Sequence, residues 1–169
     1  SLKQKQGGQK MSLKKVKAYF ENVGLGQRVH ELSQTTATVE DAARAIGCKP
    51  EHIAKTMSFL LDGEPILIVT AGDAKIDNQK YKNHFHKKAK MITAELVEQY
   101  IGHAPGGVCP FAVNPNVKVY LDISLKRFQT VYPAGGSSNS AVELSIEELA
   151  AYSGSSGWVD VCSNWFVNE

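Results

Sequence analysis

The chain has 169 residues, of which 43% are hydrophobic and 21% charged, and its formal net charge is +2. These values are typical of an ordinary globular protein with one domain. No apolar run reaches the roughly 18–20 residues that cross a bilayer, and no signal-peptide pattern opens the chain, so we expect a cytoplasmic protein without a membrane partner. Three scattered cysteines with no CxxC pair exclude a disulfide framework and make a structural zinc site unexpected.

The first segment of the chain is basic and contains a glycine pair. We expect residues 1–11 to form a disordered basic tail and residues 12–169 to form one globular domain. Apolar residues recur at helical spacing from Val16 to Val23, which predicts a first helix that stops at Gly24.

A second helix is predicted over residues 39–46. Thr38 precedes it, with Asp41 three residues further along, in a pattern much like a capping box. Gly47 follows the last apolar residue and is expected to close the helix.

Two apolar runs come next, at residues 53–61 and 65–71, and the turn Asp62-Gly63-Glu64 separates them. This pattern predicts a hairpin of largely buried strands. Later patterns predict helices near 78–85, 93–100 and 146–151, the last two capped by Thr93 and Ser145, and strands near 117–121, 128–132, 141–144 and 158–161. The hairpin and the closely spaced late strands favour an α/β (α+β) fold with a mixed sheet over a doubly wound parallel one.

Lysines gather in two segments although the net charge is small. Residues 1–20 hold six lysines and no acid, and residues 75–90 hold six lysines and the single acid Asp77. A solvated surface accounts for both segments, and the alternative is a contact surface for a nucleic-acid backbone, because clustered lysines release counterions on binding. The candidates for such a contact are Lys75, Lys80, Lys82, Lys87 and Lys88.

Two glycine pairs and one lysine point to a small-ligand pocket. Gly106-Gly107, beside Pro110, and the later pair Gly135-Gly136 give loops whose backbone can come close to a ligand. Lys55 opens an apolar run, so it either snorkels or is held at the mouth of a pocket, where its ammonium can bind a carbonyl oxygen or a phosphate. The glycines match neither GxGxxG nor GxxxxGK[ST], so a nucleotide-hydrolysing function is a weak interpretation.

Histidine and cysteine suggest two other kinds of site. His84 and His86 have no carboxylate or cysteine at ligand spacing, so we expect no metal site. Cys109 lies inside the first glycine loop and could act as a nucleophile with His103 as its general base. A small, packed thiol is the more frequent outcome for such a cysteine.

Several sequence blocks occur in a defined order over about residues 28–162. They are TVEDAARAIG, IAKTMSFL, ILIVTAGDAKID, HAPGGVCPF, VKVYLDISLKRFQTVYPAGGSSNSAVELS and the closing helix. In this order the blocks resemble the YbaK / prolyl-tRNA-synthetase-associated (ProX-like) editing family of trans-acting aminoacyl-tRNA deacylases. Any single block is weak, whereas the ordered set is specific.

The resemblance implies an α/β fold around a mixed, partly barrel-like sheet, and a free-standing enzyme that needs no cofactor. It also implies a substrate, the ester of mischarged tRNA, most often prolyl-tRNA carrying a small wrong residue such as Ala, Ser, Cys or Thr. A prolyl-tRNA synthetase or an elongation factor is an expected further partner, and the lysines of residues 75–90 become candidates for tRNA contact. Lys55 matches the family's essential lysine, and Gly106 and Gly107 match its catalytic glycine loop. Substrate-binding candidates within the matched blocks are Gly135, Gly136, Asp73 and Asp122.

One position departs from the family pattern: Ala112 stands where the family often has glycine, which implies mild strain if this residue has a positive φ. An aminoacyl ester is already activated, so its hydrolysis needs a positioned water and oxyanion stabilisation more than a strong nucleophile. We therefore expect water or substrate-assisted attack, with Lys55 orienting the ester. Two alternatives stay open: a non-catalytic tRNA- or synthetase-binding module of the same fold, and a small-molecule hydrolase that uses Cys109.

Overall fold

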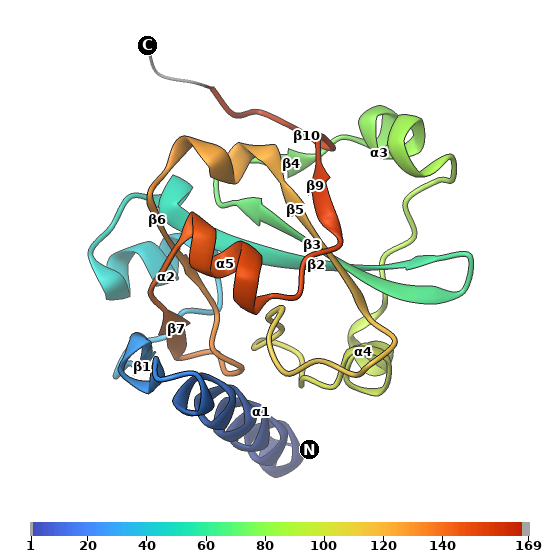
Figure 1. Ribbon diagram of the computed structural model, residues 1–169. Coiled ribbons are helices and arrows are strands. Elements are labelled where there is room, and N and C mark those ends of the chain that lie inside the picture. The colour runs from blue at the N-terminus through green and yellow to red at the C-terminus, as the bar shows by residue number, and fades with distance from the viewer. Residues whose placement is uncertain (1, 167–169) are drawn as a thin grey trace.

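The computed structural model describes residues 2–166, and a six-stranded mixed sheet forms its centre (Figure 1). In sheet order the strands are β8 (Leu144–Ser145), β6 (Thr130–Pro133), β2 (Ile53–Leu61), β3 (Glu64–Ala71), β5 (Lys118–Asp122) and β9 (Gly157–Val159). The pairs β2–β3 and β6–β8 are antiparallel, whereas β2–β6, β3–β5 and β5–β9 are parallel. Two small sheets pair β1 (Val29–Glu31) with β7 (Ser140–Val142), and β4 (Lys75–Ile76) with β10 (Cys162–Ser163).

This sheet confirms the α/β class and the mixed, partly barrel-like architecture expected from the sequence. The predicted hairpin is present as β2 and β3, whose register pairs Ala54 with Ala71 and Leu61 with Glu64. Residues 66–69 of β3 are at most 1% exposed, because other strands flank this strand and helices cover the sheet. Central strands buried on both faces have continuous apolar sequences, which is the pattern that predicts the hairpin.

Five helices surround the sheet in the described residues. They are α1 (Leu2–Asn22), α2 (Val39–Ile46), α3 (Asn78–Phe85), α4 (Ala94–Ile101) and α5 (Ile146–Tyr152), joined by short 3₁₀ helices η1 (Gly26–Arg28), η2 (Pro50–His52) and η3 (Ile123–Arg127). Within residues 2–166, none of these helices is long and apolar enough to span a membrane.

Side chains cap the start of three predicted helices, and at α3 the cap is Asp77, which accepts a hydrogen bond from the Lys80 amide. The Thr38 hydroxyl accepts a hydrogen bond from the Asp41 amide at the start of α2, and Ser145 forms a complete capping box with Glu148 at α5. The prediction for Thr93 is wrong in one respect, since it occupies the N-cap position of α4 but its side chain makes no capping hydrogen bond. Side-chain capping therefore supports α2, α3 and α5, whereas α4 depends more on its packing.

Helix α1 differs most from expectation. It begins at Leu2, whereas the sequence predicts a disordered tail over residues 1–11, of which residue 1 lies outside the described part, as do residues 167–169 of the predicted domain. Two hydrogen bonds join the first half of this helix to distant loops: Gln9 Nε2 donates to Pro105 O at 3.0 Å, and the Ala104 amide donates to Ser12 Oγ at 3.2 Å. The described part of the expected tail is thus a helix packed on the domain.

Candidate functional site

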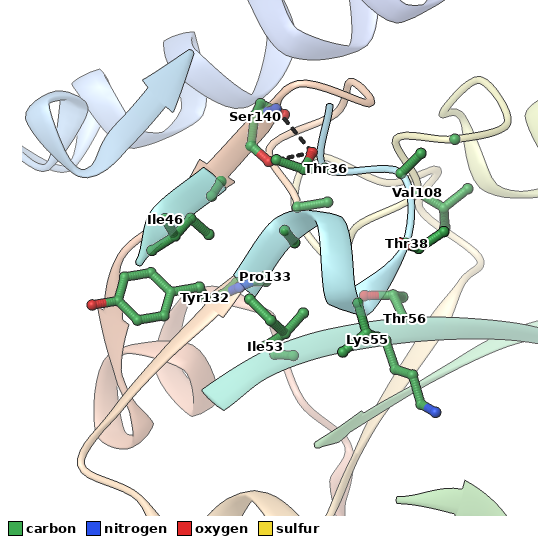
Figure 2. A pocket seen from close by; sticks show the side chains of 17 residues that line it. Thr36, Thr38, Ile46, Ile53, Lys55, Thr56, Val108, Tyr132, Pro133 and Ser140 are labelled. Carbon is green, nitrogen blue, oxygen red and sulfur yellow. Dashed lines mark hydrogen bonds between the residues drawn. The ribbon is translucent and has the colours of Figure 1, made fainter. Parts of the chain in front are cut away.

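A pocket of about 270 Å³ lies between α2, the start of β2 and the loop that contains Gly106 (Figure 2). Small side chains on its walls, among them Ala42, Ala54 and Ala141, leave this space. The volume is slightly below the range of about 300–1,000 Å³ that is usual for small-molecule sites. The pocket therefore suits a ligand the size of an amino acid.

The base of the pocket is a small hydrophobic cluster separate from the main core. Ala42, Ala43 and Ile53 are buried in this cluster, and Ile46 and Tyr132 pack against them. Helix α2 supplies one side of the cluster and β2 the other, so the amphipathic pattern and the Thr38 cap of α2 determine where the pocket wall stands.

Hydroxyl side chains line another part of the pocket, and sequence reasoning did not identify them. Thr36 Oγ1 donates to Ser140 O at 3.2 Å and accepts from the Ser140 amide at 3.3 Å, as Figure 2 shows. Thr38 Oγ1 is occupied by the capping bond of α2. Thr56 Oγ1 is buried and has no hydrogen-bond partner among the described residues. The Thr- and Ser-rich strings TTAT and SSNS were the available signal, but such strings also occur in ordinary turns and caps.

Lys55 is among the residues that line the pocket from β2, and Figure 2 shows its side chain leaving the strand on the side opposite Thr56, with the ammonium pointing away from the other labelled side chains. Its side chain forms no ion pair within residues 6–166. Burial lowers the pKa of Lys55, and repulsion from Lys75 adds to this effect, whereas Cys162 and Asp73 act in the opposite direction. Lys55 is therefore a partly desolvated cation with no carboxylate bound to it.

Only one of the four predicted glycines lines the pocket. Gly106 is exposed on the pocket wall, whereas the buried Gly107 donates its amide to Ala104 O at 3.3 Å. A Cβ atom on Gly107 would lie 2.1 Å from Gly136 O, so these two loops touch through their backbones. The Gly135 amide donates to Ser140 Oγ at 3.1 Å. The structure places Gly107, Gly135 and Gly136 in loop packing, outside the pocket lining, which corrects the expected shared pocket wall.

The two predicted aspartates also lie outside the pocket lining. Asp73 binds Arg127 through both carboxylate oxygens, at 2.6 and 2.9 Å. Asp122 is fully buried and accepts hydrogen bonds from the Ser124 and Val161 amides, each at 2.9 Å. Asp122 thus connects β5 to two neighbouring segments, and a substrate-binding role for either residue has no support from this placement.

Comparison with known proteins identifies the family. Residues 33–152 match the family model described as the aminoacyl-tRNA editing domain, which is well over half of the chain. The chain belongs to this family. An uncharacterised Bacillus subtilis protein, YwhH, is 50% identical to the editing domain over 156 residues, covering 92% of this chain and 99% of YwhH.

The editing domain is also similar in sequence to part of proline–tRNA ligases. The enzyme of Bacillus licheniformis is 29% identical over 101 residues, which are 59% of this chain but 17% of the ligase. A crystal structure described as a candidate trans-editing enzyme for prolyl-tRNA synthetase has a TM-score of 0.81 and 29% identity, covering 90% of this chain and 97% of its own. The protein APE2540 has a TM-score of 0.78 and 30% identity, covering 88% and 99%. These likenesses confirm the resemblance that the sequence blocks indicate.

The lysines of residues 75–90 lie on β4 and around α3, and Figure 1 shows α3 on the opposite side of the editing domain from α1. Lys80 pairs with Asp160 at 3.2 Å, and Lys87 pairs with Asp62 at 3.4 Å. Two of the lysines predicted to contact tRNA are therefore already paired with aspartates. In the part of the chain that the structure describes, no group of three or more His, Cys, Asp or Glu side chains is arranged to hold a metal ion.

Cys109 is fully buried in the editing domain. Its Sγ lies 3.5 Å from His103 Nε2, and His103 Nε2 lies 2.5 Å from Phe111 O. Burial raises the pKa of Cys109 to about 12 and lowers the pKa of His103. A thiol that is neutral and inaccessible cannot attack a substrate, so the geometry contradicts the hydrolase alternative. The nearby Ala112 has a φ of +53°, so the strain expected at this departure from the family pattern is present.

We expect a thiol reagent to label one cysteine of the folded editing domain and all three after unfolding. Cys48 is partly exposed, whereas Cys109 and Cys162 are buried. Mass spectrometry after a short exposure to iodoacetamide at neutral pH counts the labels, and a Cys48→Ser variant serves as the control with no label. Labelling of folded Cys109, together with loss of deacylation, would restore the nucleophile hypothesis.

Proposed function

We propose that this editing domain is an aminoacyl-tRNA deacylase that acts in trans on mischarged tRNA, with a small wrong amino acid on prolyl-tRNA as its substrate. One observation carries the proposal: Lys55, whose ammonium has no carboxylate partner among the described residues, is one of the residues that line an amino-acid-sized pocket. Membership of the editing family and the likeness to part of proline–tRNA ligases support this choice of substrate.

The proposed reaction is hydrolysis of the ester between the amino acid and the terminal ribose. A water molecule, positioned by the pocket or by the neighbouring ribose hydroxyl, forms a bond to the ester carbonyl carbon and gives a tetrahedral oxyanion. Lys55 donates to the carbonyl oxygen or to the adjoining ribose and phosphate. The carbon–oxygen bond to the ribose then breaks, the ribose oxygen takes up the proton that the attacking water gave up, and the free amino acid leaves the tRNA. Stabilising charge that develops only in the transition state raises the rate rather than the affinity.

Gly106 has a part in this scheme because it is the glycine on the pocket wall. With no side chain it lets the ester approach the backbone of the loop, where an amide can face the developing charge. Gly107 contributes by holding that loop against Gly136. In this scheme Gly106 lies near the substrate and Gly107 positions the loop.

Selectivity in this pocket depends on size. Alanine, valine, isoleucine and proline side chains make most of its walls, so a small apolar group fits and a larger one is excluded sterically. One methylene group in an apolar pocket changes binding by only about 1–3 kcal/mol, so rejection of a larger residue by overlap is the more effective route. We therefore propose that an alanyl ester is accepted and a prolyl ester is spared.

The test is a panel of proline-specific tRNA charged with Ala, Ser, Cys, Thr or Pro. We expect release of at least one of the first four amino acids at about 10-fold or more above the rate for proline, measured under single-turnover conditions. The uncatalysed hydrolysis of each ester, measured in parallel, is subtracted. Binding of every tRNA with no accelerated release would overturn the proposal and support the non-catalytic binding module.

A further inference from the structure

A line of lysines runs along the outer side of α1. We call Lys10, Lys14 and Lys17 the α1 lysine stripe, since residues three and four apart share one face of a helix. Lys10 and Lys14 are exposed, and neither forms an ion pair with another described residue. Lys17 is held by Glu31 at 3.3 Å. The stripe thus presents at least two positive charges without an ion-pair partner among the described residues.

The face of α1 that adjoins the stripe packs on the hydrophobic core. Leu13 is 7% exposed, and Val16 and Phe20 are fully buried. Among the described residues of α1, Met11 is the one large apolar side chain that is strongly exposed. A helix that binds a membrane surface must offer its apolar face to the lipid, and here the protein covers that face. The exposed side therefore suits a polyanion with its charge in solution, such as a nucleic-acid backbone.

Hydrogen bonds place the N-terminal half of α1 against the loop that carries Gly106. Gln9, next to Lys10, donates to Pro105 O at 3.0 Å and accepts from the Ser138 amide at 3.2 Å. Pro105 directly precedes Gly106, and a Cβ atom on Gly106 would lie 2.9 Å from Gln9 Nε2. The N-terminal half of α1 thus touches the loop that forms the pocket wall.

We propose that the α1 lysine stripe binds the phosphate backbone of the tRNA stem whose 3′ end enters the pocket. This inference rests on the proposed function, because it takes the pocket as the place of the aminoacyl ester. In this proposal the RNA stem that adjoins that end runs along α1, and Figure 1 shows that α3 with its lysines lies on the other side of the molecule. Lysine–phosphate interactions carry no sequence information and weaken as salt increases.

The test compares two matched double variants, Lys10→Ala/Lys14→Ala on α1 and Lys82→Ala/Lys88→Ala on the other lysine segment. All four lysines are exposed and form no ion pair within residues 6–166. The Kd for uncharged proline-specific tRNA is measured over a salt series. We expect the α1 variant to lower the slope of log Kd against log salt by about 2, roughly one for each lysine removed from a phosphate, and the control to leave it unchanged. Alanine favours the helix, so α1 should stay folded, which circular dichroism checks.

A second readout separates this inference from the proposed function. Alanyl-adenosine ester carries no RNA backbone, so we expect the α1 variant to hydrolyse it at the wild-type rate while kcat/KM for charged tRNA falls about tenfold. If wild type hydrolyses neither substrate but the α1 variant still shows the reduced salt slope, the proposed function fails and the stripe is supported. Wild-type tRNA binding by the α1 variant, an equal reduction in the control, or binding of the stripe to phosphatidylserine vesicles in place of tRNA would each overturn the inference.

Discussion

Replacement of Lys55 by methionine is expected to slow deacylation of mischarged prolyl-tRNA by on the order of 100-fold, with little change in tRNA affinity. Methionine keeps an apolar stem against the pocket wall and removes the charge, so the slower rate reports the ammonium rather than the packing. Removal of one donor to a developing oxyanion costs about 100–1,000-fold in rate at comparable sites. Single-turnover rates at saturating enzyme, together with a separate Kd for uncharged tRNA, measure the two effects.

The control for this experiment is Lys75→Met, because Lys75 lies close enough to Lys55 to influence its pKa but does not line the pocket. We expect this variant to retain most of the wild-type rate. A Lys55→Met protein that deacylates at the wild-type rate would remove Lys55 from the mechanism while leaving the pocket assignment intact.

The pH dependence of deacylation tests the role of Lys55 a second time, because the direction of the change with pH is predicted. Burial lowers the pKa of Lys55, so its ammonium loses its proton at a lower pH than the ammonium of an exposed lysine, whose pKa is about 10.4. The ratio of the enzymatic rate to the uncatalysed rate of ester hydrolysis should therefore fall as the pH rises, and the fall should begin at a lower pH than an exposed lysine would give. A Lys55→Arg variant, whose guanidinium stays charged, should not show that decline even if its absolute rate is lower.

Local sequence signals predict much of the fold because they depend on neighbouring residues. The β2–β3 hairpin follows from two apolar runs around a turn, and α2 follows from the Thr38 cap. The second half of α1 follows from its apolar spacing, but its first half was missed because Gly7 and Gly8 disfavour a helix and its supporting hydrogen bonds reach residues 92 to 129 positions away. Such long-range bonds leave no trace in the local pattern.

The candidate site was predicted in part for a similar reason. Lys55 and Gly106 line one pocket, as the ordered blocks suggest. The other glycines were misplaced because a glycine required by backbone packing and a glycine beside a ligand look alike in a sequence. Only the close approach of Gly107 to Gly136 separates these explanations, and it joins two loops far apart in the chain. Thr56 was missed because a strand hydroxyl has no distinctive spacing.

Gly107→Ala is expected to lower the free energy of unfolding by about 3 kcal/mol, the upper end of what overpacking costs. The added Cβ would lie 2.1 Å from Gly136 O and 2.5 Å from the Ser137 amide nitrogen. Both are backbone atoms that cannot rotate away, and Ser140 Oγ accepts a hydrogen bond from the Ser137 amide at 3.1 Å. Relief therefore requires one loop to move. Urea unfolding followed by fluorescence measures the change, with the slope of the transition as a check on two-state behaviour.

Gly63→Ala is the matched control, since Gly63 has a φ of +81° with no atom within 4 Å of an added Cβ. It should cost only the conformational term of about 1–2 kcal/mol. The two variants together decide what Gly107 does. Alanine keeps the backbone amide, so a purely catalytic role for that amide predicts unchanged stability at Gly107, whereas a packing role predicts a larger destabilisation than at Gly63. A Gly107→Ala protein that is as stable as wild type but deacylates more slowly would indicate that Gly107 acts on the reacting ester and not in loop packing.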